Sequence, residues 1–98
     1  MRIVAVTACP TGVAHTYMAA EQLEKTARKL GHAIKVETQG AIGIENELSQ
    51  ADIDAAEAVI VAADIAIEGA DRFDRLRKIE VTVQMVLKNP EAVFARLQ

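Results

Sequence analysis

The residues of this sequence that are best suited to chemistry lie in one short string, Cys9-Pro10-Thr11-Gly12-Val13-Ala14-His15-Thr16. Cys9 is the only cysteine of the chain and the strongest nucleophile in the string. A turn that feeds a helix offers unpaired backbone N–H groups, which bind anions such as phosphate when a glycine eases the turn. Pro10 has no N–H, so the predicted phosphate-binding residues are Thr11, Gly12, Val13, Ala14, His15 and Thr16. A cysteine beside a phosphate cradle predicts covalent phosphoryl transfer through a phosphocysteine.

Cys9 and His15 also have plainer interpretations. A lone cysteine is often a small buried hydrophobic residue, and a histidine at a helix start is often only bonded to nearby backbone. Cys9 precedes a proline in a predicted turn instead of lying inside a strand, which favours the chemical role. The common nucleotide motifs are missing, because the sequence has no Gly-Lys-Ser/Thr and no glycine-rich fingerprint after its first predicted strand.

The string also resembles the loop of cysteine-dependent phosphatases, in which a cysteine is followed by five residues, an arginine and a Ser or Thr. Here His15 takes the place of the arginine, and no Lys or Arg occurs between Arg2 and Lys25. A phosphatase needs that arginine as a bidentate clamp on the transferring phosphoryl group. The loop is therefore predicted to hold a phosphoryl group and pass it on. The alternatives are a phosphatase or thiol-redox enzyme on the same loop, and a non-catalytic module that binds a partner.

Alternating strands and helices are predicted to position the string. An apolar run over 3–6 indicates a buried strand, and apolar residues three and four apart predict a helix over 16–30. Further strands are predicted over 33–38, 58–63 and 78–81, the last short and charged as suits a sheet edge. Residues 39–43 read as a loop, and 68–75 show no clear pattern. Short helices are predicted after Ser49, with Asp52 completing a capping box, over 82–88, and after Asn89.

This order predicts an open, four-stranded, mostly parallel α/β sheet with helices on both faces, a Rossmann-like three-layer fold in one domain over residues 1–98. Sites in such sheets lie at the carboxyl ends of the strands. Segments 7–16, 38–43 and 64–69 share that rim, and only the first of them contains a nucleophile.

Composition narrows the class of protein further. The net charge of −3 argues against a nucleic-acid binder, which usually carries a basic face. A solvated face is expected for most basic side chains, namely Lys25, Arg28, Lys29, Arg72, Arg75, Arg77 and Lys78. No signal peptide is recognisable, the apolar stretch 55–67 is too short to span a bilayer, and one cysteine suits a reducing compartment. We expect no metal, no cofactor and no direct insertion into a membrane.

The string from Ile3 to Thr16, followed by Met18-Ala19-Ala20-Glu21, resembles the fructose-family enzyme IIB component of the bacterial phosphoenolpyruvate-dependent sugar phosphotransferase system. The resemblance continues through 36–40, 51–53 and 59–65, and is weaker over 68–79. It implies a transferase that accepts a phosphoryl group on Cys9 from a phosphohistidine of enzyme IIA. The group then passes to a sugar, fructose by default, held by the membrane enzyme IIC.

The resemblance places Pro10 to Thr16 at the phosphate cradle and implies a cytoplasmic protein, peripheral to the inner face of the membrane through enzyme IIC. It assigns no catalytic role to His15, Gln39 or Asp64. The choice of sugar is expected to reside in enzyme IIC, which is absent from this chain.

Overall fold

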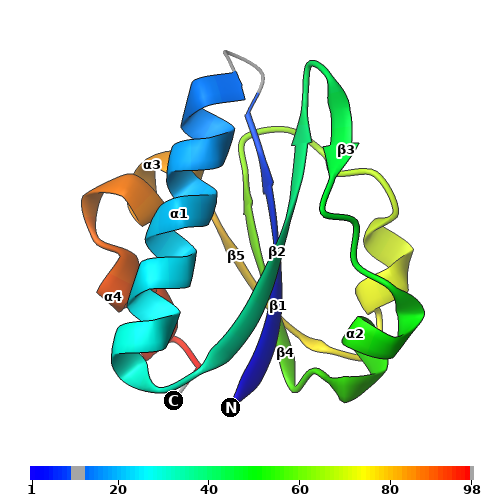
Figure 1. Ribbon diagram of the computed structural model, residues 1–98, viewed down its shortest axis with the longest axis vertical. Helices are drawn as coiled ribbons and strands as arrows, with labels where there is room; N and C mark the ends of the chain where they lie inside the picture. Colours follow the sequence, from blue (N-terminus) through cyan, green and yellow to red (C-terminus); the bar gives the residue numbers. More distant parts are fainter. Residues whose placement is uncertain (10–12, 98) are drawn as a thin grey trace.

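The computed structural model describes residues 1–9 and 13–97. Its centre is a five-stranded sheet with the strand order β3-β2-β1-β4-β5 (Figure 1). Four parallel strands make up most of the sheet, namely β1 (Arg2–Ala8), β2 (Ala33–Gly40), β4 (Ala58–Ala63) and β5 (Arg77–Val81). The fifth strand, β3 (Gly43–Glu45), pairs antiparallel with the end of β2.

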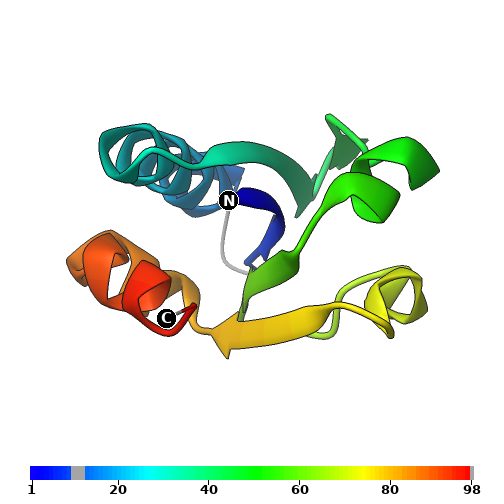
Figure 2. The ribbon, with the colours of Figure 1, turned by 90° about the horizontal axis from the view of Figure 1, so that it is seen from below.

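Helices cover both faces of the sheet and make three layers (Figure 2). One face carries α1 (Val13–Leu30), α3 (Val83–Lys88) and α4 (Pro90–Ala95). The other face carries α2 (Gln50–Ala55) and the 3-10 helix η1 (Ala70–Phe73). The predicted α/β class with helices on both faces is therefore confirmed.

The central strand β1 separates two apolar cores. Its residues alternate between the faces, so Ile3 and Ala5 join the core beneath α1, α3 and α4, whereas Val4 and Val6 join the core beneath α2 and η1. Every residue from Ile3 to Ala8 is buried because both faces are covered. This is why the strand reads as a continuous apolar run instead of an alternating one.

The predicted helix caps are confirmed. Ser49 Oγ accepts from the backbone N–H of Asp52 at 3.1 Å, and Asp52 Oδ2 accepts from the N–H of Ser49 at 2.9 Å, which is the reciprocal capping box of α2. Asn89 Oδ1 accepts from the N–H of Ala92 at 3.2 Å, and Pro90 is the first residue of α4. Strand β5 lies at a sheet edge, as its charged residues predict.

Two sequence-based boundaries were wrong. Residues 39–43 do not form a loop, because β2 runs to Gly40 and turns back into β3 through Ala41 and Ile42. Gly43 adopts φ 105°, a conformation that glycine tolerates. Ala-Ile is not a usual turn dipeptide, so the sequence did not predict this hairpin. Four strands were therefore predicted instead of five. Helix α1 begins at Val13 and not at Thr16, so that Val13, Ala14, His15 and Thr16 form its first turn.

The first and last described residues, Met1 and Leu97, lie at the amino ends of the strands, away from the carboxyl ends (Figure 1). The Met1 carbonyl accepts from the N–H of Ala33, the first residue of β2, at 3.0 Å. The Leu97 carbonyl accepts from the guanidinium of Arg77, the first residue of β5, at 3.0 Å. Among the described residues, no helix combines the length and apolarity needed to cross a bilayer.

Candidate functional site at the end of the central strand

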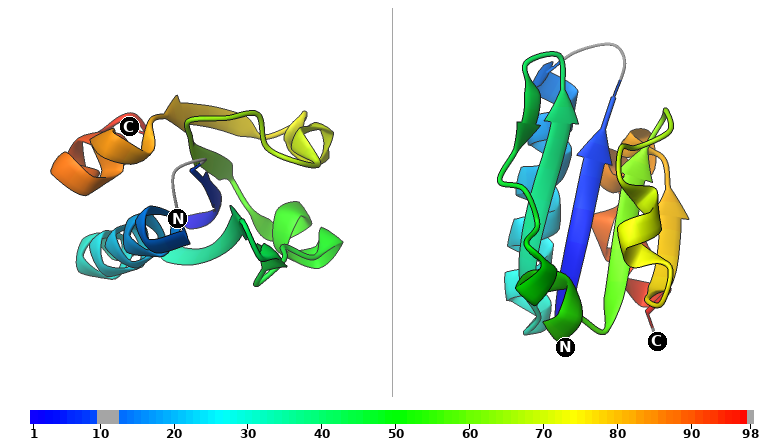
Figure 3. Two further views of the ribbon diagram at one scale, coloured as in Figure 1. Left: turned by 90° about the horizontal axis from the view of Figure 1, so that it is seen from above. Right: turned by 90° about the vertical axis from the view of Figure 1, so that its right-hand side faces the viewer.

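Cys9 follows directly after β1, at the edge where β2, β1 and β4 all end (Figure 3). The preceding residue, Ala8, lies in register with Gln39 of β2 on one side and with Ala63 of β4 on the other. The N–H of Asp64 donates to the Ala8 carbonyl at 3.1 Å, so the pairing extends to the last residue before the cysteine. Cys9 is 8% exposed and belongs to the core beneath α1.

Helix α1 starts beside Cys9 and presents its positive end there. The unpaired N–H groups of a first helical turn attract anions, and no acidic residue of this turn offsets them. A hydrogen bond of 3.1 Å from Thr7 Oγ1 to the Thr16 carbonyl ties the turn to β1. Both threonines are buried, Thr7 fully and Thr16 to 1% exposure. The helix start is therefore fixed relative to the end of the strand that carries the nucleophile.

The Thr16 hydroxyl has an unusual environment. Its oxygen, Oγ1, is buried and has no hydrogen-bond partner among the described residues. A buried hydroxyl without a partner is costly, and a water molecule or a bound group at the helix start would satisfy it. An incoming anion at the helix start is one such group.

The structure brings four of the predicted cradle residues together and leaves the others outside its description. Val13, Ala14, His15 and Thr16 form the first turn of α1, with the His15 side chain exposed. Thr11 and Gly12, which were predicted to complete the cradle, lie with Pro10 outside the described residues. Asp64, on the same rim, accepts through Oδ1 from the N–H of Val83 at 3.2 Å, which fixes the start of α3.

Behind the rim lies a buried ion pair that sequence analysis missed. The carboxylate of Glu37 in β2 is fully buried and accepts two hydrogen bonds of 2.9 Å from the Arg72 guanidinium. It also accepts from Gln39 Nε2 at 2.8 Å and from the backbone N–H of Leu48 at 2.9 Å. Arg72 was expected to be solvated, but its side chain is only 22% exposed. The sequence did not predict this pair, because Glu37 and Arg72 become neighbours only when β2 and η1 come together in the fold.

Arg72 and Gln39 both continue from Glu37 to the segment after β4. Arg72 donates to the carbonyls of Gly69 at 2.8 Å and Glu68 at 3.1 Å, and its guanidinium lies 4.7 Å from the centre of the Phe73 ring. Gln39 donates to the Glu68 carbonyl at 3.0 Å and accepts from the Glu68 N–H at 2.8 Å. One network therefore holds the segment 64–69 at the rim.

Electrostatics favour the ionised form of this network. Burial alone would raise the pKa of Glu37, but the hydrogen bonds from Arg72, Gln39 and the Leu48 N–H, together with the charge of Arg72, lower it below its usual value. The pKa of Arg72 is correspondingly raised, chiefly by its hydrogen bonds to Glu37. Glu37 and Arg72 therefore form a charged pair at neutral pH.

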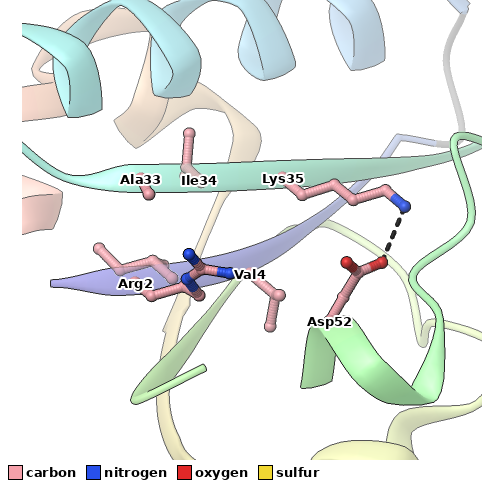
Figure 4. Close-up of a pocket in the computed structure, with 7 residues that line it drawn as sticks. Arg2, Val4, Ala33, Ile34, Lys35 and Asp52 are labelled. Carbon is pink, nitrogen blue, oxygen red and sulfur yellow. Dashed lines mark hydrogen bonds and ion pairs between the residues drawn. The ribbon is translucent and has the colours of Figure 1, made fainter. Parts of the chain in front are cut away.

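A pocket of about 190 Å³ lies at the opposite end of the sheet (Figure 4). It is lined by the amino-terminal residues of β1 and β2 and by Asp52, whose Oδ2 pairs with Lys35 Nζ at 2.8 Å. The hydrogen bond from Lys35, with those from the Ser49 backbone and side chain, lowers the pKa of Asp52 to about 2. This pocket lies at the opposite end of β1 from Cys9, so the rim around Cys9 remains the candidate site.

Comparison with known proteins shows the family of this chain. The family described as "PTS system, Lactose/Cellobiose specific IIB subunit" matches residues 4–96. The chain belongs to the IIB family of the sugar phosphotransferase system. The "PTS system fructose-like EIIB component 2" of Escherichia coli is 46% identical over 97 residues, which are 99% of this chain and 92% of that protein.

Other relatives of this IIB domain are larger or have solved structures. The "Fructose-like PTS system EIIBC component" of Escherichia coli is 50% identical over 99% of this chain, which spans only 20% of that protein. A crystal structure of a predicted fructose-specific IIB from Escherichia coli has a TM-score of 0.93 at 43% identity, covering 97% of this chain and 84% of that one. A domain of a fructose-specific IIABC component from Borrelia burgdorferi has a TM-score of 0.92 at 47% identity, covering 97% and 90%.

Proposed function

We propose that this IIB domain carries a phosphoryl group on Cys9 during the uptake of a fructose-like sugar. The Cys9 sulfur attacks the phosphorus of a phosphohistidine on enzyme IIA, the N–P bond breaks, and its electron pair returns to the histidine. In the second step a hydroxyl of the sugar bound to enzyme IIC attacks the phosphorus. The S–P bond then breaks, its electrons return to Cys9, and the hydroxyl releases its proton to solvent, which balances the proton that the histidine takes up in the first step.

The observation that carries this proposal is the placement of Cys9 beside the first turn of α1, whose Thr16 hydroxyl is buried without a partner among the described residues. A phosphoryl group on the sulfur brings acceptor oxygens to helix-start N–H groups and to that hydroxyl. Thr11, Gly12, Val13, Ala14, His15 and Thr16 are the cradle in this proposal. No residue here has to activate water, because the group moves between protein and sugar.

The proposed partners follow from membership of the IIB family. A phosphorylated enzyme IIA is the donor and the membrane enzyme IIC holds the sugar, so the domain works at the inner face of the cytoplasmic membrane. The names of several relatives refer to fructose-like or fructose-specific systems, and another relative is named for 2-O-alpha-mannosyl-D-glycerate. A fructose-like sugar is the proposal that agrees with most of these names.

The test is to map the phosphoryl group directly. The chain is incubated with phosphoenolpyruvate, the general phosphotransferase proteins and its cognate enzyme IIA, and the modified residue is identified by mass spectrometry. We expect modification at Cys9 and none in Cys9→Ser. A phosphoryl group on His15 or His32 would contradict the assignment. Turnover of a small phosphoester or a disulfide without any partner would favour the phosphatase or thiol-redox alternative.

A further inference from the structure

The side chain of Gln39 crosses the end of the central strand. Strands β2 and β4 flank β1 on opposite sides, and Gln39 is the second-last residue of β2 whereas Glu68 follows β4. The Gln39 amide makes two hydrogen bonds to the Glu68 backbone, at 3.0 Å to the carbonyl and 2.8 Å from the N–H. A side chain that joins these two positions must pass the end of β1 at Ala8, which is in register with Gln39 and precedes Cys9.

This bridge lies on the opposite face of the sheet from Cys9. Glu37 and Gln39 are two residues apart in β2, so their side chains leave the same face. This is the face covered by α2 and η1, as the hydrogen bonds of Glu37 with the Leu48 N–H and with Arg72 of η1 show. Cys9 belongs to the core on the α1 face. The bridge therefore covers the end of β1 on the face of α2 and η1, which we call the rear of the rim. The start of α1 covers it on the other face, the front of the rim.

The ion pair fixes the orientation of the bridging amide. An ionised carboxylate only accepts hydrogen bonds, so Gln39 must direct its NH₂ group toward Glu37 Oε2, at 2.8 Å. The amide oxygen then faces the N–H of Glu68, and the remaining NH₂ hydrogen faces its carbonyl. Arg72 keeps the Glu37 carboxylate charged and also binds the Glu68 carbonyl at 3.1 Å. Each hydrogen-bonding group of the Gln39 amide thus has a partner of the matching kind.

We propose that Gln39, oriented by Glu37 and Arg72, is a positioning residue that holds segment 64–69 against the end of β1 and keeps water from the rear of the phosphocysteine. The proposal rests on the proposed function, because the shielded group is the phosphoryl group on Cys9. In the reaction that it suppresses, a water oxygen attacks the phosphorus, the S–P bond breaks with its electrons returning to Cys9, and inorganic phosphate leaves. Segment 64–69 begins with Asp64, whose N–H already pairs with Ala8.

The test compares Gln39→Met with Lys35→Met. Methionine keeps the length of the Gln39 side chain and removes its hydrogen bonds to Glu37 and Glu68. Lys35→Met is the matched control, because Lys35 lies on the same face of β2 and loses its bond to Asp52 at the other end of the sheet. Gln39→Asn, which keeps an amide but is one methylene too short for Glu68, serves as a milder variant. Each chain is phosphorylated with the complete donor system, purified, and followed by mass spectrometry as the phosphocysteine decays.

We expect the phosphocysteine to decay roughly tenfold faster in Gln39→Met than in the wild type. The reason is that segment 64–69, having lost buried hydrogen bonds, opens more often. In Lys35→Met we expect an unchanged decay rate. Hydrogen exchange at the Glu68 amide should rise by a similar factor in Gln39→Met alone. Equal decay rates in phosphorylated wild type and both Gln39 variants would overturn this inference and leave the proposed function intact. A wild-type chain that takes up no phosphoryl group on Cys9 would overturn both.

Discussion

Replacement of Arg72 by methionine tests whether the buried pair stabilises the fold as the structure predicts. The change leaves the Glu37 carboxylate, which is fully buried, with hydrogen bonds only from Gln39 and the Leu48 N–H. Removal of one partner of a buried ion pair costs about 3–5 kcal/mol, because the other charge stays buried and uncompensated. Arg72 is 22% exposed, so water already reaches part of it, and we expect a loss of about 3 kcal/mol at neutral pH.

The cost should depend on pH. In the wild type the folded pKa of Glu37 is lowered, so the stability that its ionisation contributes is present above the unfolded pKa and is lost as pH falls through the folded value. In Arg72→Met the contributions of Arg72 that lower the pKa of Glu37 are lost while the burial that raises it remains, so we expect the folded variant to bind a proton more readily and its deficit to shrink as pH falls. A protonated Glu37 needs no counter-charge. At about pH 4.5 we therefore expect the loss of stability in Arg72→Met to be about 1 kcal/mol, which comes from the lost hydrogen bonds.

Urea unfolding followed by far-UV circular dichroism suits this test, since the chain has no tryptophan. Arg75→Met is the matched control, because Arg75 pairs with Asp54 at 2.6 Å while both side chains are 57% exposed. An exposed pair of this kind contributes about 0–1 kcal/mol. A loss for Arg72→Met that equals that of Arg75→Met, or that does not change between the two pH values, would refute the reasoning.

Two further outcomes are expected. His15→Arg restores the position of the phosphatase clamp and should shorten the phosphocysteine half-life, measured by mass spectrometry on folded protein. The gain should fall well short of the roughly 10²–10³ that one transition-state donor supplies in a complete active site, because the loop sequence contains no Asp or Glu as general acid. Asp52→Asn should destabilise α2. Because the pKa of Asp52 is lowered to about 2, the wild-type advantage should be present above about pH 4 and disappear toward pH 2, which urea unfolding across this range measures.

Local sequence signals predicted the parts of the fold that depend on neighbours in the chain. The spacing of Ser49 and Asp52 predicted a capping box, and the apolar run before Cys9 predicted a strand covered on both faces. The same signals placed Cys9 at the carboxyl edge of the sheet. These predictions succeed because a helix cap and the apolar pattern of a strand each depend on residues that are close together in the sequence.

Features that join distant segments escaped prediction. Glu37 reads as the polar member of an alternating strand, and Arg72 as a surface charge in a segment without pattern, yet they meet across 35 positions of sequence. The strand β3 was missed because its three residues are all exposed and so show no alternation. A charged residue in a strand that is covered on both faces was the available signal for a buried partner.

The position of the two chain ends has a consequence for how this domain can be tethered. Met1 and Leu97 both lie at the amino edge of the sheet, and β1, with seven residues, separates that edge from Cys9 by about 23 Å at roughly 3.3 Å per residue. A tether at either end therefore starts at the edge of the sheet opposite to the rim. Its length can set the effective concentration of a partner domain. The same geometry suits a chain whose match covers 20% of the length of one relative and 92% of the length of another.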